Sequence, residues 1–302
     1  MLSNPPRNAI ICGDAAEVMA TWPDECIDLT VTSPPYDLVD FDAAGNLVTY
    51  PSQGLRDYEG YTWDFVSIAR QLWRVTKRGG VVVWVVGDMT VDGSETCTPD
   101  RQKLYFRSLG FRVHDTMIYD RNKAATHDPR NKRYKQQFEY MFVLSKGSPK
   151  TYNEIKDKPV KNKVAASVTS RNSNGTMRKQ GKVELLEYQA RSNIWNIPNG
   201  YMKSTADKEA YDVPAIFPEA LAYDHIRSWS TPGDLVLDCF NGSGTTTKKA
   251  KQLDRDYVGI DVSRKYCDIA ERRVVAATLP ILEALKVEPV QLPLLEVESD
   301  DT

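Results

Sequence analysis

The chain has 302 residues, 41% of them hydrophobic, which is enough to bury the core of one large α/β domain with an insertion or of two modest domains. The longest apolar run, Val81 to Val86, is too short to cross a bilayer, and residues 1–7 lack an apolar signal region. We therefore expect a soluble, cytoplasmic protein without a membrane partner. Five cysteines form no CxxC pair and do not cluster with the three histidines, which favours reduced thiols over a structural zinc or other metal site.

The net charge of -2 is very unevenly distributed along the chain. Between Arg121 and Lys182 there are sixteen Lys or Arg against four Asp or Glu, a balance of +12, which leaves -14 for the remainder. Such asymmetry indicates a basic face on an acidic body, as a nucleic-acid-binding protein needs. The alternative is a solvated loop.

Apolar strand-like runs alternate with segments of helical spacing along most of the chain. Strands are expected at Asn8 to Gly13, Asp28 to Thr32, Gly80 to Gly87, Phe111 to Tyr119, Tyr140 to Ser145, Leu235 to Phe240 and Tyr257 to Val262. Helices are expected at Tyr61 to Val75, Asp100 to Leu109, Pro214 to Ser230, Thr245 to Leu253 and Arg264 to Ala277. This alternation predicts an α/β fold, a doubly wound and mostly parallel sheet.

One polar region interrupts the alternation and suggests the domain organisation. From Tyr152 to Arg191 the chain is rich in Lys, Ser, Asn and Thr, with Asn172 to Gly175 as its most flexible point. We interpret residues 121–200 as a basic recognition insertion, of which 140–146 return to the sheet. Residues 1–120 and 201–285 form the two halves of the main domain, and 286–302 form a solvated acidic tail.

A glycine-rich turn follows the strand that ends at Asp238. Gly242-Ser243-Gly244 leads into a helix, and the next strand ends at Asp261, nineteen residues after Gly242. Glycines at such a turn let a ligand approach the backbone, and a carboxylate nineteen residues on suits ribose hydroxyls. The third glycine of a dinucleotide site and the GxxxxGK[ST] phosphate loop are both missing. Asp238 would repel a pyrophosphate and attract an ammonium group, so S-adenosylmethionine fits best; the alternative is a turn that only packs helix on strand.

The strand that ends at Thr32 stops at Ser33-Pro34-Pro35-Tyr36. Two prolines stiffen an extended backbone and hold Ser33 and the Pro34 carbonyl at the carboxyl edge of the strand, where α/β sheets bind ligands. These two acceptors could hold the hydrogens of a nucleobase amino group and direct its lone pair to a methyl donor, while Tyr36 stacks on the base. Taken alone, the segment also fits a proline turn that caps a strand.

In this order the two motifs resemble the circularly permuted β group of amino-methylating DNA methyltransferases. In that family a (D/N/S)PPY motif comes first, a target-recognition region follows, and a DPFxGSGTT motif comes last. Trp73 to Gly80, Glu139 to Gly147, Phe217 to Leu221, Gly259 to Ser263 and Gly13-Asp14 resemble further family segments. The resemblance implies a seven-stranded sheet, S-adenosyl-L-methionine (SAM) as methyl donor, S-adenosyl-L-homocysteine as product, and a flipped base as target.

The resemblance also implies roles for individual residues. The catalytic set is Ser33, Pro34, Pro35 and Tyr36. The cofactor-binding set is Asp14, Phe217, Pro218, Asp238, Phe240, Gly242, Ser243, Gly244, Thr245 and Asp261. The basic insertion supplies the expected DNA-binding set, which is Arg121, Arg130, Lys132, Arg133, Lys135, Arg171, Arg178 and Lys179. Double-stranded DNA is the expected partner; a homodimer and a cognate restriction endonuclease are further partners that the resemblance allows, in a bacterial, archaeal or phage-encoded protein.

The departures from the family pattern concern mainly the target base. Cys239 replaces the usual proline and Arg78 another, neither of which should abolish activity. Ser33 replaces the aspartate that is commonest in adenine-specific members, which favours the 4-amino group of cytosine, with the 6-amino group of adenine as the alternative.

Other functions explain the sequence less well. Ring-carbon methylation of cytosine needs a cysteine nucleophile, usually in a Pro-Cys pair, and the chain has none. Glutamine methylation would not explain the +12 insertion, and RNA amino-methylation is a minor alternative. A non-catalytic DNA-binding protein with a vestigial cofactor fold should have lost Tyr36 or Asp238, and both are present. The ExK pattern of Glu154-Ile155-Lys156 lacks a convincing partner acid for a nuclease.

Overall fold

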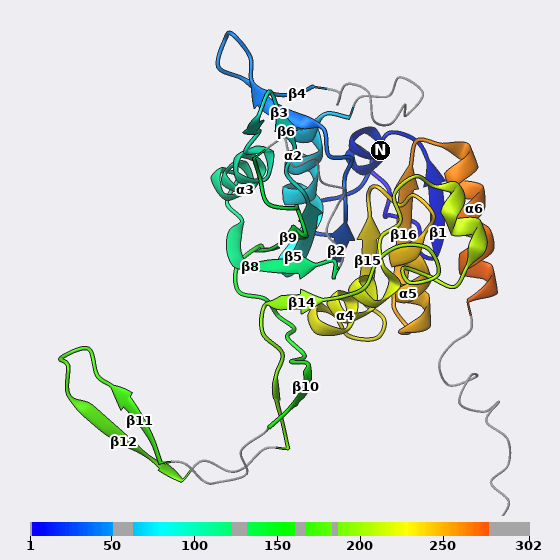
Figure 1. Cartoon of the computed structure of the whole chain (residues 1–302). Coiled ribbons are helices and arrows are strands. Elements are labelled where there is room, and N and C mark those ends of the chain that lie inside the picture. Colours follow the sequence, from blue (N-terminus) through cyan, green and yellow to red (C-terminus); the bar gives the residue numbers. More distant parts are fainter. Residues whose placement is uncertain (1, 51–62, 123–131, 161–166, 183–186, 278–302) are drawn as a thin grey trace, which may run out of the picture.

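A central sheet forms the core of the computed structural model, which describes residues 2–50, 63–122, 132–160, 167–182 and 187–277. Its eight strands are ordered β1-β16-β15-β2-β5-β9-β8-β14. All neighbouring strands are parallel except at β9, which runs antiparallel to both β5 and β8. Figure 1 shows the strands from the beginning and the end of the chain interleaved in this sheet.

The strands of this sheet differ in length and in burial. Their bounds are β1 Ala9–Cys12, β2 Ile27–Thr32, β5 Thr76–Val86, β8 Arg112–Asp120, β9 Phe138–Ser145, β14 Ile194–Asn196, β15 Leu235–Asp238 and β16 Asp256–Asp261. Every residue of β2 and β15 is buried, as expected for central strands covered on both faces.

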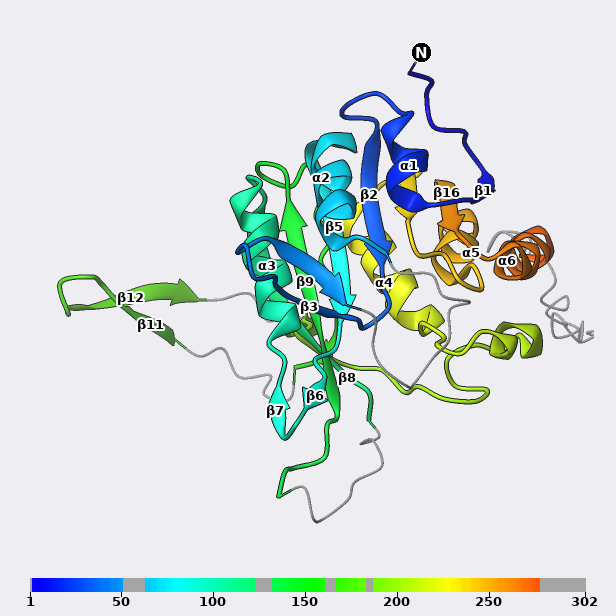
Figure 2. The ribbon, with the colours of Figure 1, turned by 90° about the horizontal axis from the view of Figure 1, so that it is seen from above.

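In the described part of the chain, three helices cover each face of the sheet. The helices α1 (Ala15–Ala20), α2 (Phe65–Val75) and α3 (Thr98–Ser108) pack on one face, and α4 (Glu219–Trp229), α5 (Thr245–Gln252) and α6 (Arg264–Ala276) pack on the other. Figure 2 shows the sheet between these layers. In α2 the buried residues recur with helical spacing, as Phe65, Ile68, Ala69, Leu72 and Val75. The side chain of Asp64 caps its first turn by accepting a hydrogen bond from the amide of Val66 (2.9 Å).

The doubly wound α/β fold is confirmed, with one strand more than the seven expected. The additional strand, β14, comes from residues that we interpreted as part of the recognition insertion, and it pairs in parallel with β8. β9, in the same range, also belongs to the sheet. The proposed domain boundaries themselves stay predictions.

Each expected strand and helix is present, with shifted ends. The helix expected from Pro214 begins at Glu219, because Pro218 has an extended backbone and occupies its N-cap. The helix expected from Tyr61 begins at Phe65, and Tyr61 itself lies outside the described residues. Elements that the sequence analysis missed are α1, the 3-10 helix η2 (Lys208–Asp212), and the small two-stranded sheets of β3 (Leu38–Phe41) with β4 (Leu47–Tyr50), β6 (Thr90–Val91) with β7 (Ser94–Glu95), and β10 (Lys156–Pro159) with β13 (Tyr188–Ala190).

Asn172 to Gly175, the predicted flexible point of the polar region, has a turn structure. These residues form the turn of a hairpin between β11 (Ser167–Arg171) and β12 (Met177–Lys182). The amide of Asn172 donates to the carbonyl of Thr176 (2.8 Å), and Gly175 takes a φ of +85° that suits glycine. In Figures 1 and 2 this hairpin projects from the body of the molecule.

None of the helices in the described residues is both long and apolar enough to cross a membrane. The acidic tail expected at 286–302 lies outside the described residues.

Candidate active site

The two sequence motifs meet at the carboxyl edge of the sheet. β2 carries Ser33-Pro34-Pro35-Tyr36 at its end, β15 ends at Asp238, and the two strands are parallel neighbours. The hydroxyl of Thr32 donates to Oδ1 of Asp238 at 2.6 Å, across 206 residues of sequence. Thr246, in the first turn of α5, donates to the carbonyl of Val31 (3.1 Å). The early and late motifs are thus parts of a single site.

Asp238 is a buried carboxylate with no cationic partner among the residues that the structure describes. Its side chain is 5% exposed, and besides Thr32 it accepts a hydrogen bond from the amide of Phe240 (3.1 Å). No lysine or arginine of the described residues lies within ion-pair distance of it, and burial raises its pKa to about 6 although the bond from Thr32 opposes the shift. A buried, uncompensated negative charge is costly, so this position suits a cationic ligand.

The glycine turn between β15 and α5 depends on two left-handed residues. Gly242 has a φ of +48° and Gly244 a φ of +79°. A Cβ atom on Gly244 would lie 2.7 Å from the Cβ of Ala270, so a glycine is needed here for α5 and α6 to approach each other. Ser243 and Thr245, the other predicted turn residues, are buried.

Asp261 lies at the end of β16, beside this turn. Its Oδ2 accepts a hydrogen bond from the amide of Gly242 (2.7 Å), and its Oδ1 accepts one from the amide of Ser263 (2.9 Å). Asp261 therefore shapes the turn, besides being the residue predicted to hold ribose hydroxyls. Asp14 follows the adjacent strand β1, where its Oδ1 caps α1 by accepting hydrogen bonds from the amides of Ala16 (2.8 Å) and Glu17 (3.0 Å).

On the β2 side, Tyr36 is held by groups that the sequence analysis did not select. Ser33 and Pro35 are half-buried and Pro34 is buried. The hydroxyl of Tyr36 donates to Oε2 of Glu139 at 2.8 Å. The ring lies against Gly87 at the end of β5. The two are so close that a Cβ on that glycine would come within 2.9 Å of Tyr36 Cε2. Burial and then the charge of Glu139 raise the pKa of Tyr36 well above its ordinary value, so the hydroxyl stays protonated and donates.

Comparison with known proteins identifies the family. Residues 27–272 match the model of the N6/N4 methyltransferase family, described as DNA methylase. The orphan methyltransferase M.BamHII of Bacillus amyloliquefaciens is 50% identical over 255 residues, which cover 83% of this chain and 89% of that protein. The type II methyltransferase M.SmaI of Serratia marcescens is 27% identical over 88% of this chain and 90% of its own length.

The chain belongs to this family. It is a DNA amino-methyltransferase, an enzyme whose methyl donor is SAM, as the motifs predicted.

Solved structures show the same fold. The PvuII DNA methyltransferase, a cytosine-N4-specific enzyme, has a TM-score of 0.61 and 22% identity, and the match covers 89% of this chain and 87% of that one. A putative DNA modification methylase from Thermus thermophilus, solved in complex with SAM, has a TM-score of 0.53 and 24% identity, with 89% and 97% covered. At these identities the likeness concerns the fold of the methyltransferase.

The residues of the site fit SAM. The donor set includes the buried, cation-free carboxylate of Asp238 for a positively charged moiety, and the tight glycine turn gives a ligand access to the backbone. Phe240 is half-buried and packs edge-on against Trp63, with ring centroids 5.0 Å apart. Phe217 is half-buried and Pro218 is buried just before α4. Trp63 lies within the helix expected from Tyr61 but was not predicted to contact the site, because its packing on Phe240 joins residues far apart in the sequence.

An ionic cluster centred on Arg273 of α6 supports the glycine turn. It was not predicted from the sequence. Arg273 of α6 is 1% exposed and donates to the hydroxyl of Ser243 (2.9 Å), to Asp207 (2.9 Å) and to Glu219 (3.0 Å). Lys248 of α5 also bonds both acids, each at 2.7 Å. Burial alone would raise the pKa of Glu219, but hydrogen bonds from the lysines outweigh it and lower that pKa to about 2. The cluster ties the 201–213 segment, α4, α5 and α6 to the glycine turn.

The predicted DNA-binding residues fall into two separate groups. The first lies around the β8–β9 connection, where Lys132 and Lys135 are exposed and Arg133 bonds the carbonyl of Gly93. The second lies on the β11–β12 hairpin, where Arg171 is exposed and Arg178 and Lys179 belong to β12. Arg130 lies outside the described residues.

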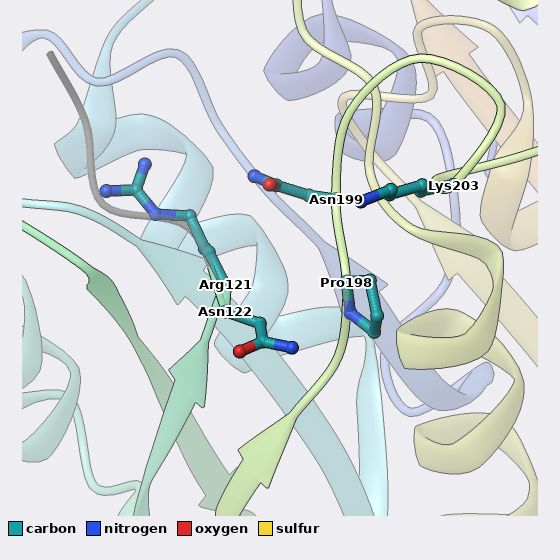
Figure 3. A pocket seen from close by; sticks show the side chains of 5 residues that line it. All are labelled: Arg121, Asn122, Pro198, Asn199 and Lys203. Atoms are coloured by element: carbon teal, nitrogen blue, oxygen red, sulfur yellow. The ribbon is translucent and has the colours of Figure 1, made fainter.

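Arg121, also predicted to bind DNA, has internal partners. Its guanidinium pairs with Glu139 (3.3 Å) and donates to the carbonyl of Gln136 (2.8 Å). It also borders a pocket of about 320 Å³ between the end of β8 and the loop after β14. Figure 3 shows Arg121 and Asn122 on one wall and Pro198, Asn199 and Lys203 on the other. None of the last three was selected from the sequence, because each is an ordinary loop residue there.

Proposed function

We propose that this methyltransferase acts at specific DNA sites and transfers the methyl group to the 4-amino group of a flipped cytosine. The observation that supports it most is the junction of β2 and β15, where Ser33 to Tyr36 adjoin Asp238 through the Thr32 bond. The target base and the donor methyl group would meet at that junction. Adenine is the alternative target, and Ser33 in place of the commoner aspartate is what favours cytosine.

The residues of the site have distinct roles in this proposal. The hydroxyl of Ser33 and the carbonyl of Pro34 accept hydrogen bonds from the amino group, with Pro35 keeping this backbone extended, so that the nitrogen lone pair faces the methyl donor. Tyr36 stacks on the flipped base, which contributes roughly 1 to 3 kcal/mol toward the cost of extracting it from the duplex. SAM supplies an electrophilic methyl group on a sulfonium. Positioning of the two reactants accounts for most of the rate acceleration.

The proposed contacts with SAM come from residues at the carboxyl ends of several neighbouring strands. Asp238 would attract the ammonium of the methionine moiety, with Phe217 and Pro218 beside that moiety. Asp261 would hold the ribose hydroxyls, Asp14 would lie near the adenine, and the turn from Gly242 to Thr245 would lie along the ligand. Each of these contacts rests on the motif position and on the location of the residue at the carboxyl edge.

The basic groups would contact DNA phosphates and leave a few side chains to read bases. The enzyme would act in the cytoplasm, where bacterial DNA is accessible. A homodimer and a companion endonuclease stay predictions.

The decisive experiment is methylation of plasmid DNA with purified protein and SAM, followed by mass spectrometry of the nucleosides. We expect N4-methylcytosine, and modification-sensitive sequencing of the same DNA should locate it at one short sequence. N6-methyladenine would replace the cytosine assignment with adenine, and unmodified nucleosides would contradict the proposal. As a site control, Ser33→Ala should lower turnover while leaving the SAM dissociation constant unchanged.

A further inference from the structure

The ring of Tyr36 is fixed at its hydroxyl by a chain of polar contacts. The hydroxyl donates to Oε2 of Glu139 (2.8 Å), and Oε1 of the same carboxylate pairs with Arg121 (3.3 Å). The side chain of Glu139 is 15% exposed and that of Arg121 is 19% exposed, so solvent screens these contacts only weakly. Tyr36, Glu139 and Arg121 come from three places in the sheet: the segment after β2, the start of β9 and the residue after β8.

Each of these three residues constrains the next. Two backbone carbonyls, those of Gln136 and Gln137, accept hydrogen bonds from Arg121 and orient its guanidinium. The guanidinium occupies one oxygen of Glu139, which leaves the other oxygen directed at Tyr36. Because Tyr36 remains protonated, it can only donate to that acceptor.

A second contact fixes the position of the ring. Gly87 lies so close to Tyr36 Cε2 and Cδ2 that a Cβ there would approach them to 2.9 and 3.2 Å. The ring therefore lies against the backbone at the end of β5 on one side and is anchored through its hydroxyl at the far end. An aromatic ring held at these two points presents its face in one defined orientation, ready for stacking. An unanchored tyrosine would instead populate several rotamers, of which only some could stack on a base.

We propose that Glu139, supported by Arg121, is a positioning residue that orients Tyr36 for stacking on the target base. It acts through Tyr36 and does not touch the reacting atoms. Loss of the anchor should reduce the fraction of bound DNA in which the base is held for methyl transfer, and so reduce kcat. Binding of SAM and overall DNA affinity should change little. This inference rests on the proposed function, in which Tyr36 contacts the flipped base.

The test is a double-mutant cycle of Tyr36→Phe and Glu139→Ala on DNA carrying the site found by sequencing. Each single variant should lower kcat about tenfold, as expected for loss of a hydrogen bond to a charged group. KM for DNA and the dissociation constant of SAM should stay within about twofold of wild type. Both substitutions remove the hydrogen bond between Tyr36 and Glu139; Tyr36→Phe also removes a hydrogen bond with Ser33, and Glu139→Ala also removes the pair with Arg121. The double variant should therefore be much less than a hundredfold slower, whereas independent effects would multiply to about a hundredfold.

Two further variants separate positioning from general destabilisation. Glu139→Gln keeps a carbonyl that can accept from Tyr36, so it should recover much of the lost kcat. Asp224→Ala is the matched control for loss of a half-buried ion pair. Asp224, on α4, is also 15% exposed and pairs with Arg191 at 2.6 Å. We expect this control to lower the melting temperature about as much as Glu139→Ala while kcat stays at the wild-type value.

Several results would overturn the inference. They are multiplicative effects in the double variant, wild-type kcat in Glu139→Ala, or an equal loss of kcat in Asp224→Ala. If the wild-type enzyme itself left DNA unmethylated, that result would contradict the proposed function and not the role of Glu139.

Discussion

At the scale of single residues, the buried carboxylate of Asp238 has a raised pKa that bears on its proposed contact with SAM. Burial raises its pKa to about 6, so in the free enzyme the carboxylate gains a proton as the pH falls through that value. For the stability of the free protein, this raised pKa means a contribution that is fully present below the ordinary pKa of an aspartate and is lost as the pH rises through about 6.

We predict that SAM binds more weakly as the pH falls from about 7.5 to about 5.5. The reason is that a cationic ligand favours the charged carboxylate, and protonation of Asp238 removes that attraction. Titration calorimetry across this range should show the dissociation constant rising, and the Asp238→Asn variant should show weak binding at both ends. A flat profile in the wild type would indicate that Asp238 does not contact the cationic moiety.

The predicted site residues and the missed ones differ in the kind of signal that they leave in the sequence. Ser33 to Tyr36 and Gly242 to Thr245 are contiguous motifs, and their occurrence together in this order indicated chemistry. Glu139 lies 103 residues from the tyrosine that it anchors. Such a partnership depends on how the sheet folds, which local pattern does not specify. Arg121 was predicted from its charge, and its internal role became visible only from its contacts.

At the scale of elements, the turn between β15 and α5 holds the late motif in place. A glycine is needed at position 244 for two reasons: its backbone is left-handed, and a Cβ there would overlap Ala270. Gly233, which precedes β15, shares only the first property, because its φ is +81° and a Cβ there would meet nothing within 4 Å.

We predict that Gly244→Ala destabilises the enzyme more than Gly233→Ala and also weakens SAM binding. Both substitutions should incur about 1 kcal/mol of backbone strain. Only the first also overlaps Ala270 across the α5–α6 interface, an overpacking that adds roughly 1 to 3 kcal/mol. Thermal denaturation should show the difference, and calorimetry should show reduced SAM affinity in Gly244→Ala alone. Equal melting temperatures would mean that α6 can shift without cost.

The elements themselves were predictable in proportion to their length and burial. Strand β5 contains the buried apolar run Val81 to Val86, and in β2 apolar residues alternate with polar ones. Helix α2 repeats its apolar residues with helical spacing, and all three elements were predicted. Helix α1 spans 6 residues and β14 spans 3, which is too short for any periodicity to register. The order of the strands in the sheet was not predicted, because periodicity does not specify which strands pair.

At the scale of the whole molecule, the β11–β12 hairpin extends the enzyme beyond its catalytic body. Residues 167–182 carry four basic residues, Arg171, Arg178, Lys179 and Lys182, and no acidic residue. β11 and β12 form a separate two-stranded sheet, apart from the central one. A two-stranded ribbon of this kind is narrow enough to enter the major groove of DNA.

We predict that replacing residues 167–182 by a short Gly-Ser linker leaves the melting temperature and SAM affinity unchanged and weakens DNA binding. The slope of log affinity against log salt should fall by about 0.9 for each DNA phosphate that the protein no longer neutralises. A variant that keeps the hairpin and changes its four basic residues to Gln separates charge from shape. If the linker variant bound DNA with the wild-type salt slope, the DNA-binding surface would have to lie on the body, around the β8–β9 connection.

The interleaving of early and late strands has a consequence for how the enzyme is made. In the sheet order β1-β16-β15-β2, the first two strands of the chain are separated by two strands that the ribosome produces about two hundred residues later. Until β15 and β16 emerge, β2 lacks its neighbour on that side and Thr32 lacks its bond to Asp238. The segment proposed to hold the base, Ser33 to Tyr36, is therefore translated long before the glycine turn proposed to bind SAM. A nascent or prematurely terminated chain can carry the basic hairpin and yet have no means of modifying the DNA that it meets.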